Sequence, residues 1–451
     1  MKRLLLPLCV VAAALGACST DDDVSSNDTD AIGTGDGAED GTEDGTGDGT
    51  GDGTGDDPSG EEDEQETGDD RVTRYGGSWN DDDDPSVCTT VLEPGADAED
   101  AVNGASPGDV ICLRAGEFER LIIENVGQEG APIVVRAYPG ERHQAKVVAN
   151  GAYSIRINHS DYIEVEGLWL DGAINQGLYV YDSDYVIGRF NRVTNVGQEC
   201  MRFKFSDFGA FAYNVIETCG TNGPNGEGIY VGSGEEQGDD SHGVAIVGND
   251  ISDTHDEGIE LKGSTYDGLV EGNLVHDLIC RDGGGIVVTS SDYGAGGTWE
   301  TGHVIRGNIV WNVETETQYK DGNGINIRRG AHVYNNVVYD NQHFGIRVDD
   351  KWGQGGSVAV HHNTMCNNAL SGIAILNGTT VDLQGNIGSD DDGNIGCDAA
   401  FFRDAGNGDY RLLPGTDALD GAPDLGITTD MDGGARPAGA GFDFGAYELQ
   451  P

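Results

Sequence analysis

The chain has 451 residues, and its 80 Asp and Glu against 25 Lys and Arg give a formal net charge of −55 at pH 7. Such an acidic chain argues against nucleic acid as a partner, because phosphates bind to basic surfaces. The charge is compatible with a saline or calcium-containing exterior, and equally with simple solubility.

The N-terminus has the pattern of an exported lipoprotein. Lys2 and Arg3 precede an apolar run over residues 4–14, and a Leu-Gly-Ala-Cys sequence ends at Cys18. A short apolar run behind a positive start is typical of a secretory signal and is too short to span a bilayer. The last four residues resemble the bacterial lipobox, which implies that residues 1–17 are removed and that Cys18 is lipidated. We therefore expect a protein of the cell surface or outer membrane, held at the membrane by lipid alone; the alternative is an ordinary signal peptide with a chance cysteine.

Residues 18–70 are expected to form a disordered acidic tether. The stretch 19–70 contains 21 Asp or Glu and no Lys or Arg, and Gly-Asp-Gly-Thr repeats between Gly45 and Asp57. A segment with almost no apolar residues to bury stays disordered, and its like charges extend it. A calcium-binding glycine-rich repeat would need an apolar residue in every unit, and none is present here.

The folded part is expected to begin with a cap at residue 71. Residues 92–113 predict a short helix followed by the first strand. An exported protein permits disulfides, and Cys88 and Cys112 flank this first strand, so we expect them to be paired. Cys366 with Cys397 is a second candidate pair, and the odd number of remaining cysteines leaves at least one thiol in the core.

A repeated motif runs through the second half of the chain. Gly-Ile-x-apolar begins at residues 228, 258, 285, 324, 345 and 372, and an apolar-x-x-Asn unit ends at Asn214, Asn249, Asn273, Asn308, Asn336, Asn363 and Asn386. Period-two alternation predicts short strands, and a repeat of this length predicts stacked coils that share one core. Glycine and asparagine are expected at sharp turns, since both tolerate left-handed dihedrals. The sequence thus predicts an all-β, right-handed parallel β-helix over residues 71–400 with its N-terminal cap, and residues 401–451 as a C-terminal cap that hides the last open edge.

Aligning the coils on the Gly-Ile pair places side chains in columns on the outside of the β-helix, about 4.8 Å apart from coil to coil. Ile259 and Leu261 then point inward, whereas Glu260 and Lys262 point outward. The residue before the glycine is acidic in three successive coils: Glu199, Glu227 and Glu257. The position two after the glycine carries Arg202, Tyr230, Glu260, Asn326 and Arg347, and the position four after it carries Lys204, Lys262, Thr289 and Arg328. Acids stacked beside bases indicate a site on the coil 249–272.

Longer repeats flank this coil on both sides. They predict loops near residues 234–241 and 292–302, and the second loop contains Trp299. An exposed aromatic ring beside a polar groove is suited to stacking on a sugar, and the alternative is a loop that packs on its own side chain.

The segment from Asp256 to Lys262 resembles the part of chondroitinase B and related alginate lyases that carries carboxylates for calcium and a catalytic lysine. The resemblance implies Ca²⁺ bound by Glu227, Glu257 and Asp256, and proton abstraction by Lys262. The arginine of that family is expected near residue 289, where this chain has threonine, so Arg281 or Arg328 would take its place. The Pro-Gly-Asp strand at residues 107–113 and the Ala-Pro-Ile strand at 131–137 also resemble the start of secreted bacterial β-helix carbohydrate enzymes.

The same region also resembles polygalacturonases, at residues 225–229, 256–257 and 326–328. That resemblance implies an inverting hydrolase, which needs two carboxyl groups about 6.5–9.5 Å apart. A surface protein that binds without cleaving is the third hypothesis, because a β-helix by itself implies no reaction. The leading prediction is a monomeric cell-surface lipoprotein that binds an extracellular acidic polysaccharide and cleaves it by β-elimination. Arg202, Lys204, Tyr230, Glu260, Asn326, Arg347 and Trp299 are the candidate substrate-binding residues.

Overall fold

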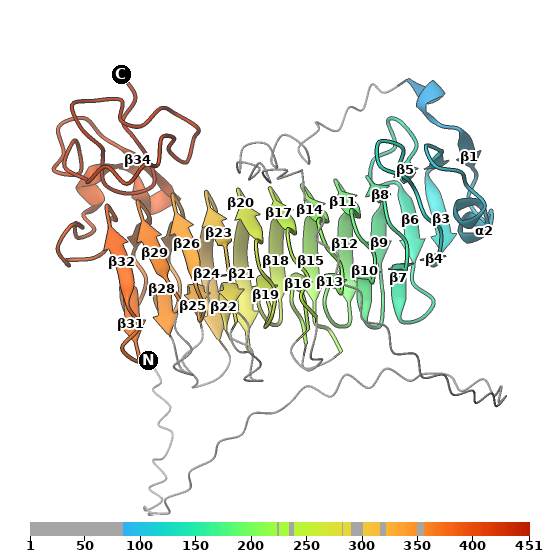
Figure 1. The fold of residues 1–451 in the computed structure, drawn as a ribbon, viewed down its shortest axis with the longest axis horizontal. Helices are drawn as coiled ribbons and strands as arrows, with labels where there is room; N and C mark the ends of the chain where they lie inside the picture. Colours follow the sequence, from blue (N-terminus) through green and yellow to red (C-terminus); the bar gives the residue numbers. More distant parts are fainter. Residues whose placement is uncertain are drawn as a thin grey trace, which may run out of the picture. The chain divides into compact units, whose positions relative to one another are not determined.

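The computed structural model describes residues 84–222, 225–233, 239–281, 283–289, 301–315, 322–349 and 356–451. Within these residues the chain is a ladder of short parallel strands (Figure 1), with one α-helix, α2 (Ala98–Asn103), and the 3-10 turns η1 (Pro85–Val87), η2 (Ala399–Phe401) and η3 (Ala405–Asn407). The predicted all-β, right-handed parallel β-helix is confirmed. The predicted signal, the tether and Cys18 lie outside the described residues. Among the described residues no helix is long and apolar enough to cross a membrane.

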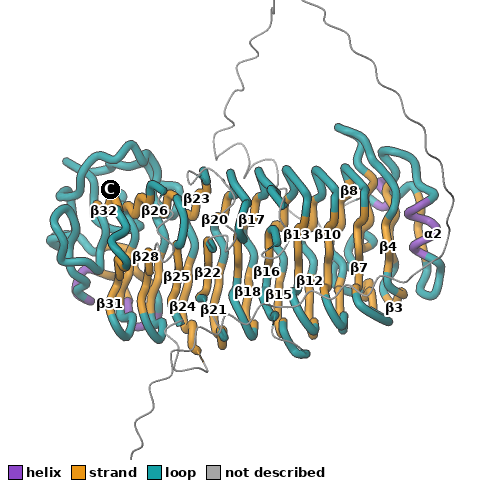
Figure 2. The backbone as a smooth tube through the Cα atoms, turned by 60° about the horizontal axis from the view of Figure 1, so that its bottom comes forward, coloured by secondary structure: helices purple, strands orange, loops and turns teal. Residues whose placement is uncertain are grey.

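Each complete coil contributes one strand to each of three sheets, which we call sheets A, B and C, and β1 and β32 extend sheet A by one strand at each end (Figure 2). Sheet A consists of β1 (Thr90–Leu92), β2 (Val110–Leu113), β5 (Ile133–Ala137), β8 (Ile163–Glu166), β11 (Ile187–Arg189), β14 (Ala210–Ala212), β17 (Ala245–Val247), β20 (Leu269–Glu271), β23 (His303–Arg306), β26 (Ala331–Tyr334), β29 (Val358–His361) and β32 (Val381–Gln384). Sheet B consists of β3 (Gly116–Glu119), β6 (Ala145–Val148), β9 (Trp169–Asp171), β12 (Arg192–Val196), β15 (Val215–Cys219), β18 (Asp250–Thr254), β21 (Leu274–Cys280), β24 (Ile309–Thr315), β27 (Val337–Tyr339) and β30 (Thr364–Cys366). Sheet C consists of β4 (Leu121–Ile123), β7 (Tyr153–Asn158), β10 (Gln176–Tyr181), β13 (Met201–Lys204), β16 (Ile229–Val231), β19 (Ile259–Leu261), β22 (Gly284–Val288), β25 (Asn323–Ile327), β28 (Phe344–Asp349) and β31 (Ser371–Leu376).

The inward residues of the Gly-Ile motif form the continuous core. Ile259 is 0% exposed and Leu261 is 1% exposed, and Ile259 pairs in register with Ile229 and Ile286 of the neighbouring coils. The glycine of the motif has a packing role. A Cβ at Gly258 would lie 2.4 Å from the Val275 Cγ1 atom and 2.7 Å from a backbone oxygen of the next coil. No atoms approach that closely without rearrangement, so glycine is required at this position by the tight stack.

The repeated asparagines form a hydrogen-bonded ladder inside the turn between sheets A and B. The Asn249 Oδ1 atom accepts from the backbone N–H and the Nδ2 atom of Asn214, at 3.0 and 2.9 Å. Its own Nδ2 atom donates to the Asn273 Oδ1 atom at 3.0 Å. The left-handed dihedral falls on the preceding residue, for example Gly248 (φ 64°) and Gly272 (φ 65°). The prediction that these asparagines supply the left-handed turn is therefore wrong; their side chains satisfy buried polar groups.

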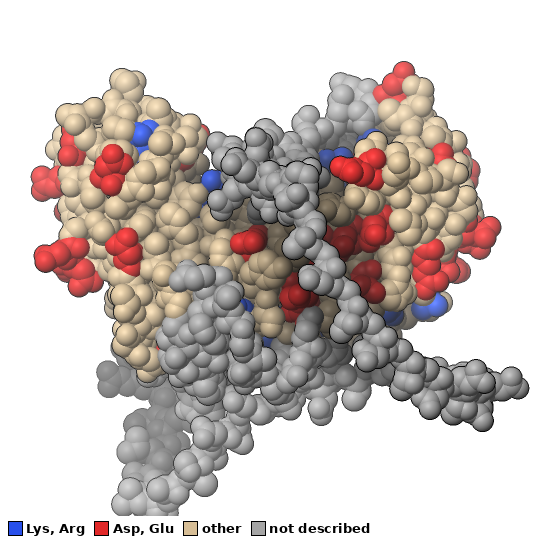
Figure 3. Space-filling model, viewed as in Figure 1, with Lys and Arg blue, Asp and Glu red and all other residues tan. Residues whose placement is uncertain are grey.

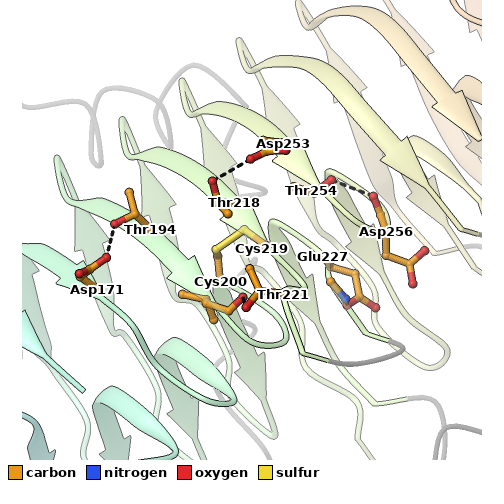
Figure 4. Close-up of a disulfide and its surroundings, with 12 residues drawn as sticks. Asp171, Thr194, Cys200, Thr218, Cys219, Thr221, Glu227, Asp253, Thr254 and Asp256 are labelled. Atoms are coloured by element: carbon orange, nitrogen blue, oxygen red, sulfur yellow. Dashed lines mark hydrogen bonds between the residues drawn. A yellow bond between two sulfur atoms is a disulfide. The ribbon is translucent and has the colours of Figure 1, made fainter. Parts of the chain in front are cut away.

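Three disulfides staple the described part of the chain. Cys88–Cys112 and Cys366–Cys397 are present as expected, and the Cys280 thiol is buried and donates to the backbone oxygen of Asp256 at 3.3 Å. The third bond, Cys200–Cys219, is not apparent from the sequence, because Cys200 occupies the glycine position of the repeat. It joins the segment just before β13 to the end of β15 (Figure 4), so it closes one coil on itself.

The C-terminal segment packs against the side of the last coils. Strands β33 (Phe402–Asp404) and β34 (Asp409–Leu412) form an antiparallel pair. The Tyr410 ring lies 5.1 Å from that of Tyr339 on β27, and the Ala446 N–H donates to the Thr364 hydroxyl at 3.0 Å. Among the described residues β31 pairs only with β28; Leu370, just before β31, is 58% exposed, and Ile375 within it is 40% exposed.

Candidate functional site

Sheet C brings together the columns expected from the repeat. The strand register pairs Arg202 with Tyr230, and then continues through Glu260, Val287, Asn326 and Arg347 in successive coils. These side chains lie outside the core, and several of them are nevertheless covered. Arg202 is 4% exposed and Glu260 is 2% exposed. The strand register confirms the predicted columns, and their side chains form a packed polar layer on the outside of the core.

Three carboxylates converge in this layer. One oxygen from each of Glu227, Glu257 and Glu260 lies within 4.8 Å of the other two, and all three residues are buried. Glu227 and Glu257 precede β16 and β19 in adjacent coils, and Glu260 is the central residue of β19. We call this cluster the carboxylate triad. The Lys262 Nζ atom lies 3.2 Å from the Glu260 Oε1 atom, so the triad and the lysine form one electrostatic unit.

Hydrogen bonds and close packing hold the triad in place. The Gly226 N–H donates to the Glu227 Oε2 atom at 2.9 Å, and the Thr289 hydroxyl donates to the Glu260 Oε1 atom. Gly283 (φ +98°) lies directly against the Glu257 carboxylate. A Cβ atom at this position would come within 2.1 Å of the Glu257 Oε1 atom, so only glycine fits here. Gly283 was not predicted as a site residue, although a run of three glycines at 283–285 marks the position. Thr289, by contrast, was predicted to lie in the same column as Lys262.

Burial and like charges make ionisation of the triad unfavourable. Burial raises the pKa of Glu227 well above its usual value, and the carboxylates of Glu199, Asp256 and Glu260 raise it further. Burial also raises the pKa of Glu257, with additional contributions from its acidic neighbours. Carboxylates crowded in this way bind protons or a cation, because they cannot all remain charged without one.

Lys262 is held in its charged form. Burial opposes the charge, but Glu260, followed by Tyr230, Glu257 and Glu227, raises the lysine pKa well above its usual value. The ammonium group lies 5.9 Å from the centre of the Tyr230 ring, whose other neighbour is the Arg202 guanidinium at 4.7 Å. With the triad as it stands, Lys262 is therefore a proton donor and a counter-ion.

The other predicted site residues lie at different distances from the triad. Asp256 lies outside the group of converging oxygens, although its side chain hydrogen-bonds with Glu257. Arg328 follows β25 and lies in the same column as Lys262, two coils further along the chain. This register is set by the Arg328 backbone N–H, which donates to the Val288 carbonyl oxygen. Arg281 is exposed in the turn after β21. Arg347 pairs with Asp349.

Three further candidates complete the set. Lys204 is 2% exposed and is buried in the layer, and Asn326 is 0% exposed with both polar side-chain atoms unpaired within the described residues. Trp299 lies outside the described residues. Figure 4 shows Glu227 and Asp256 next to the Cys200–Cys219 disulfide. The disulfide therefore anchors the coil that precedes the triad.

The spacing of the acids bears on the reaction. The nearest oxygens of Glu227 and Glu257 lie within 4.8 Å, whereas an inverting hydrolase leaves about 6.5–9.5 Å between its two carboxyl groups for a water molecule. Oxygens this close are suited to sharing a proton or a cation. The described surface seen in Figure 3 carries many more acidic than basic side chains.

Comparison with known proteins gives the same fold. The family model described as right handed beta helix region matches residues 153–332, and the chondroitinase B model matches residues 94–207. The crystal structure of pectate lyase Pel9A is 14% identical with a TM-score of 0.51, covering 80% of this chain and 96% of that one. An alginate lyase from Paenibacillus sp. str. FPU-7 is 18% identical with a TM-score of 0.46, covering 66% of this chain and 98% of that one. The periplasmic alginate epimerase AlgG is 14% identical with a TM-score of 0.37, covering 66% and 82%.

No curated protein sequence matches the chain. The two family models and the fold shared with Pel9A agree with the predicted fold and family resemblance, and the chondroitinase B match ends before the triad. The chain therefore has the fold of the right-handed parallel β-helix carbohydrate-active proteins and resembles chondroitinase B over residues 94–207.

Proposed function

We propose that the protein is a polysaccharide lyase that cleaves an extracellular acidic polysaccharide at the carboxylate triad. The observation that carries the proposal is the convergence of Glu227, Glu257 and Glu260 beside Lys262. β-Elimination requires that the carboxylate of a uronate be neutralised and that a base lie close to the adjacent C–H bond. The triad with its lysine offers both kinds of group on two adjacent coils.

The triad fits a calcium ion by its chemistry. Calcium prefers oxygen ligands, several of them carboxylates, and three carboxylate oxygens within 4.8 Å of one another are crowded enough to need a cation. Glu227, Glu257 and Glu260 would hold the ion. When bound, calcium would neutralise the triad and the carboxylate of the substrate.

Lys262 is the candidate base. Its raised pKa has the carboxylates as its main source, so neutralising these groups lowers the lysine pKa toward the range in which it accepts a proton. In the elimination, Lys262 takes the proton from the carbon next to the uronate carboxylate. The electron pair of that bond forms a carbon–carbon double bond, and the glycosidic oxygen leaves from the neighbouring carbon and takes up a proton.

A panel of polymers tests the proposal. The protein is incubated with pectate, alginate, chondroitin and neutral glycans in the presence of calcium, and ultraviolet absorbance and reducing ends are both measured. Absorbance from an unsaturated uronate, together with new reducing ends, supports the lyase. Reducing ends without absorbance indicate a hydrolase, and retention of a polymer without cleavage indicates a binding protein; either result contradicts the proposal.

Calcium is expected to stabilise the fold through the triad. The raised pKa values of Glu227 and Glu257 mean that the ion-free folded state holds protons that the unfolded chain has lost above about pH 4.5. The free energy of unfolding of the ion-free protein should therefore fall as the pH rises from about 4.5 toward the raised pKa values of Glu227 and Glu257. Calcium at a hundred times its Kd should add about 2.7 kcal/mol. Thermal melting with calcium or chelator measures this gain, which should grow with pH.

The matched variants locate the calcium effect. Glu227→Gln should abolish most of the gain in Tm, whereas Glu217→Gln, which removes a partly exposed acid paired with Arg192 on sheet B, should keep it. An equal gain in both variants would show that calcium binds elsewhere.

We also propose that the mature protein begins at Cys18 and is anchored by lipid on that residue. The support is the lipobox-like sequence at the end of the apolar run, followed at once by the acidic stretch 19–70. Cys18→Ser should move the protein from the membrane fraction to the soluble fraction, measured by immunoblotting after detergent-free fractionation. A variant that remains with the membrane would indicate a different attachment.

A further inference from the structure

The outer face of sheet A carries an apolar cluster that is separate from the core of the β-helix. Phe211, Ile246 and Val270 belong to the core, and they lie on the neighbouring strands β14, β17 and β20 (Figure 1). Side chains alternate across a strand, so the residues on either side of these three point away from the core. Those residues form a second cluster, which we call the sheet A patch: Ala210, Ala212, Ala245, Val247 and Leu269.

The sheet A patch is buried although it lies on the outside. Its three alanines are 0% exposed and its two larger members are 3% exposed. Within the described part of the chain, the partly buried apolar residues packed against it are Ile187, Val304 and Tyr213, which all come from sheet A or from the turn that follows it. By contrast, Ala359 faces outward further along the same sheet and is only half-buried. The outer face of an antiparallel or parallel sheet is not buried by its own strands, so the burial indicates a covering segment.

The chain enters the fold on this same face. The Cys88–Cys112 disulfide joins the segment before β1 to β2. Cys112 heads the outward column of sheet A that continues, rung by rung, to Ala212 and Val247. With about 4.8 Å between neighbouring strands, the strands from β11 to β23 lie about 14 to 34 Å from β2. The first described residues are therefore held beside the row of strands that carries the patch.

The segment just before the described residues has the length and the side chains to cover the patch. Thirteen residues, 71–83, separate the acidic stretch from the first described residue. At about 3.3 Å per residue they reach about 43 Å, which is enough to pass the whole patch. Residues 71–80 contain no Asp or Glu, whereas residues 19–70 contain 21. Val72, Tyr75 and Trp79 supply apolar groups, and the short alanines of the patch let a ring approach the sheet closely.

Charge also favours this segment. Acidic side chains border the patch at both ends, with Glu164 and Glu166 on β8 and Glu271 on β20. Burial raises the pKa of Glu164 to about 7, so added positive charge at this end is favourable. Arg71 and Arg74 supply such charge, and the reach of residues 71–83 brings both borders within their range.

We propose that residues 71–80 form an arm that lies along the sheet A patch of the same chain. The apolar side chains of the arm cover β14 and β17, and its arginines lie toward the acidic borders. Apolar surface on the outside of the β-helix is thereby removed from water. The acidic stretch that precedes the arm then leaves the folded part from sheet A, and sheet C with the carboxylate triad stays clear of it.

Trypsin tests the arm on the full-length protein. Arg71 and Arg74 are the only Lys or Arg between Arg3 and Arg114, so cleavage in this region reports on the arm alone. A docked arm is cut only while it is detached. Trp79→Ser removes the largest apolar group of the arm without touching a strand, and it should raise the cleavage rate about tenfold. Mass spectrometry of the digest over time measures the rate.

A substitution in the sheet tests the same contact from the other side. Ala245→Glu places a charge in the patch, so it should raise the cleavage rate at least as much as Trp79→Ser. Ala359→Glu is the matched control, because Ala359 lies in the same outward column as Ala245 but on β29, beyond the patch. The control should keep the parental rate. If Ala245→Glu does not fold, Trp79→Ser still decides, since it leaves the β-helix unchanged.

The remaining outcomes overturn the arm. Equal cleavage rates in the parent and in Trp79→Ser would show that residues 71–80 are not docked. Faster cleavage in Ala359→Glu as well would show a general loosening of the fold instead of a contact at the patch. Protection that increases with protein concentration, together with a dimer in analytical ultracentrifugation, would place a second copy of the chain on the patch.

Discussion

Replacing Lys262 by alanine should lower kcat by about 10²-fold or more on a confirmed substrate, because the candidate base is lost. The side chain is 27% exposed and lies outside the apolar core, so the variant should melt close to the parent. Steady-state kinetics and thermal melting measure the two properties. The parental rate should rise with pH, since the base works only after it loses its proton and its pKa is raised.

The matched control for this variant is Lys146→Ala. Lys146 also pairs with an acid, Asp171 at 2.8 Å, and also lies over an aromatic ring, that of Trp169. It belongs to sheet B, away from the triad. If Lys262→Ala keeps parental activity, the base lies elsewhere on sheet C, and Arg328, Arg347 and Asp349 are the next candidates.

Glu257→Gln gives an independent test of the same unit. Loss of a triad carboxylate should also lower kcat by about 10²-fold. It removes one of three mutually repelling groups, so in the presence of a chelator the variant should be at least as stable as the parent. In the lyase, added calcium should restore part of its activity; in a hydrolase, activity of the parent would survive chelation and the variant would be inactive at any calcium concentration.

Ile259→Asp should destabilise the fold by more than about 4 kcal/mol, because it places a carboxylate in the apolar stack of sheet C. Ile259 is 0% exposed and is packed in the main core cluster. Chemical denaturation of the parent and the variant measures the difference in unfolding free energy.

Ile279→Asp is the control for this prediction. Ile279 is 43% exposed on β21, so the same substitution should change stability by less than about 1 kcal/mol. Similar melting of the Ile259→Asp variant and the parent would contradict the inward placement of residues 259 and 261, and a shift of one residue would turn Glu260 and Lys262 into the core.

The fold and the columns could be predicted because both follow from local rules. Alternation around the Gly-Ile pair determines which side of the strand Ile259 and Glu260 occupy, and the repeat determines which residues stack. That was sufficient to place Glu227 above Glu257. The position of the turns was predicted correctly, but the role of the asparagines was not. Their side chains serve as hydrogen-bonding groups, and the left-handed dihedral belongs to residues such as Gly248 and Gly272.

The details of the site depend on contacts between coils and on burial, which the repeat does not encode. Glu260 was expected to bind substrate, and its position within 4.8 Å of two other acids gives it a place in the triad instead. Asp256 neighbours Glu257 in sequence, but its carboxylate lies outside the triad. The charge state of Lys262 could not be decided from sequence, because it depends on which neighbours are nearest and how deeply they are buried.

The asparagine ladder has a consequence for how this protein can change during evolution. Each asparagine is satisfied by the coils immediately before and after it, so a tandem duplication or deletion of one complete coil leaves every remaining amide with a partner. The ladder thus permits the chain to lengthen or shorten by single coils.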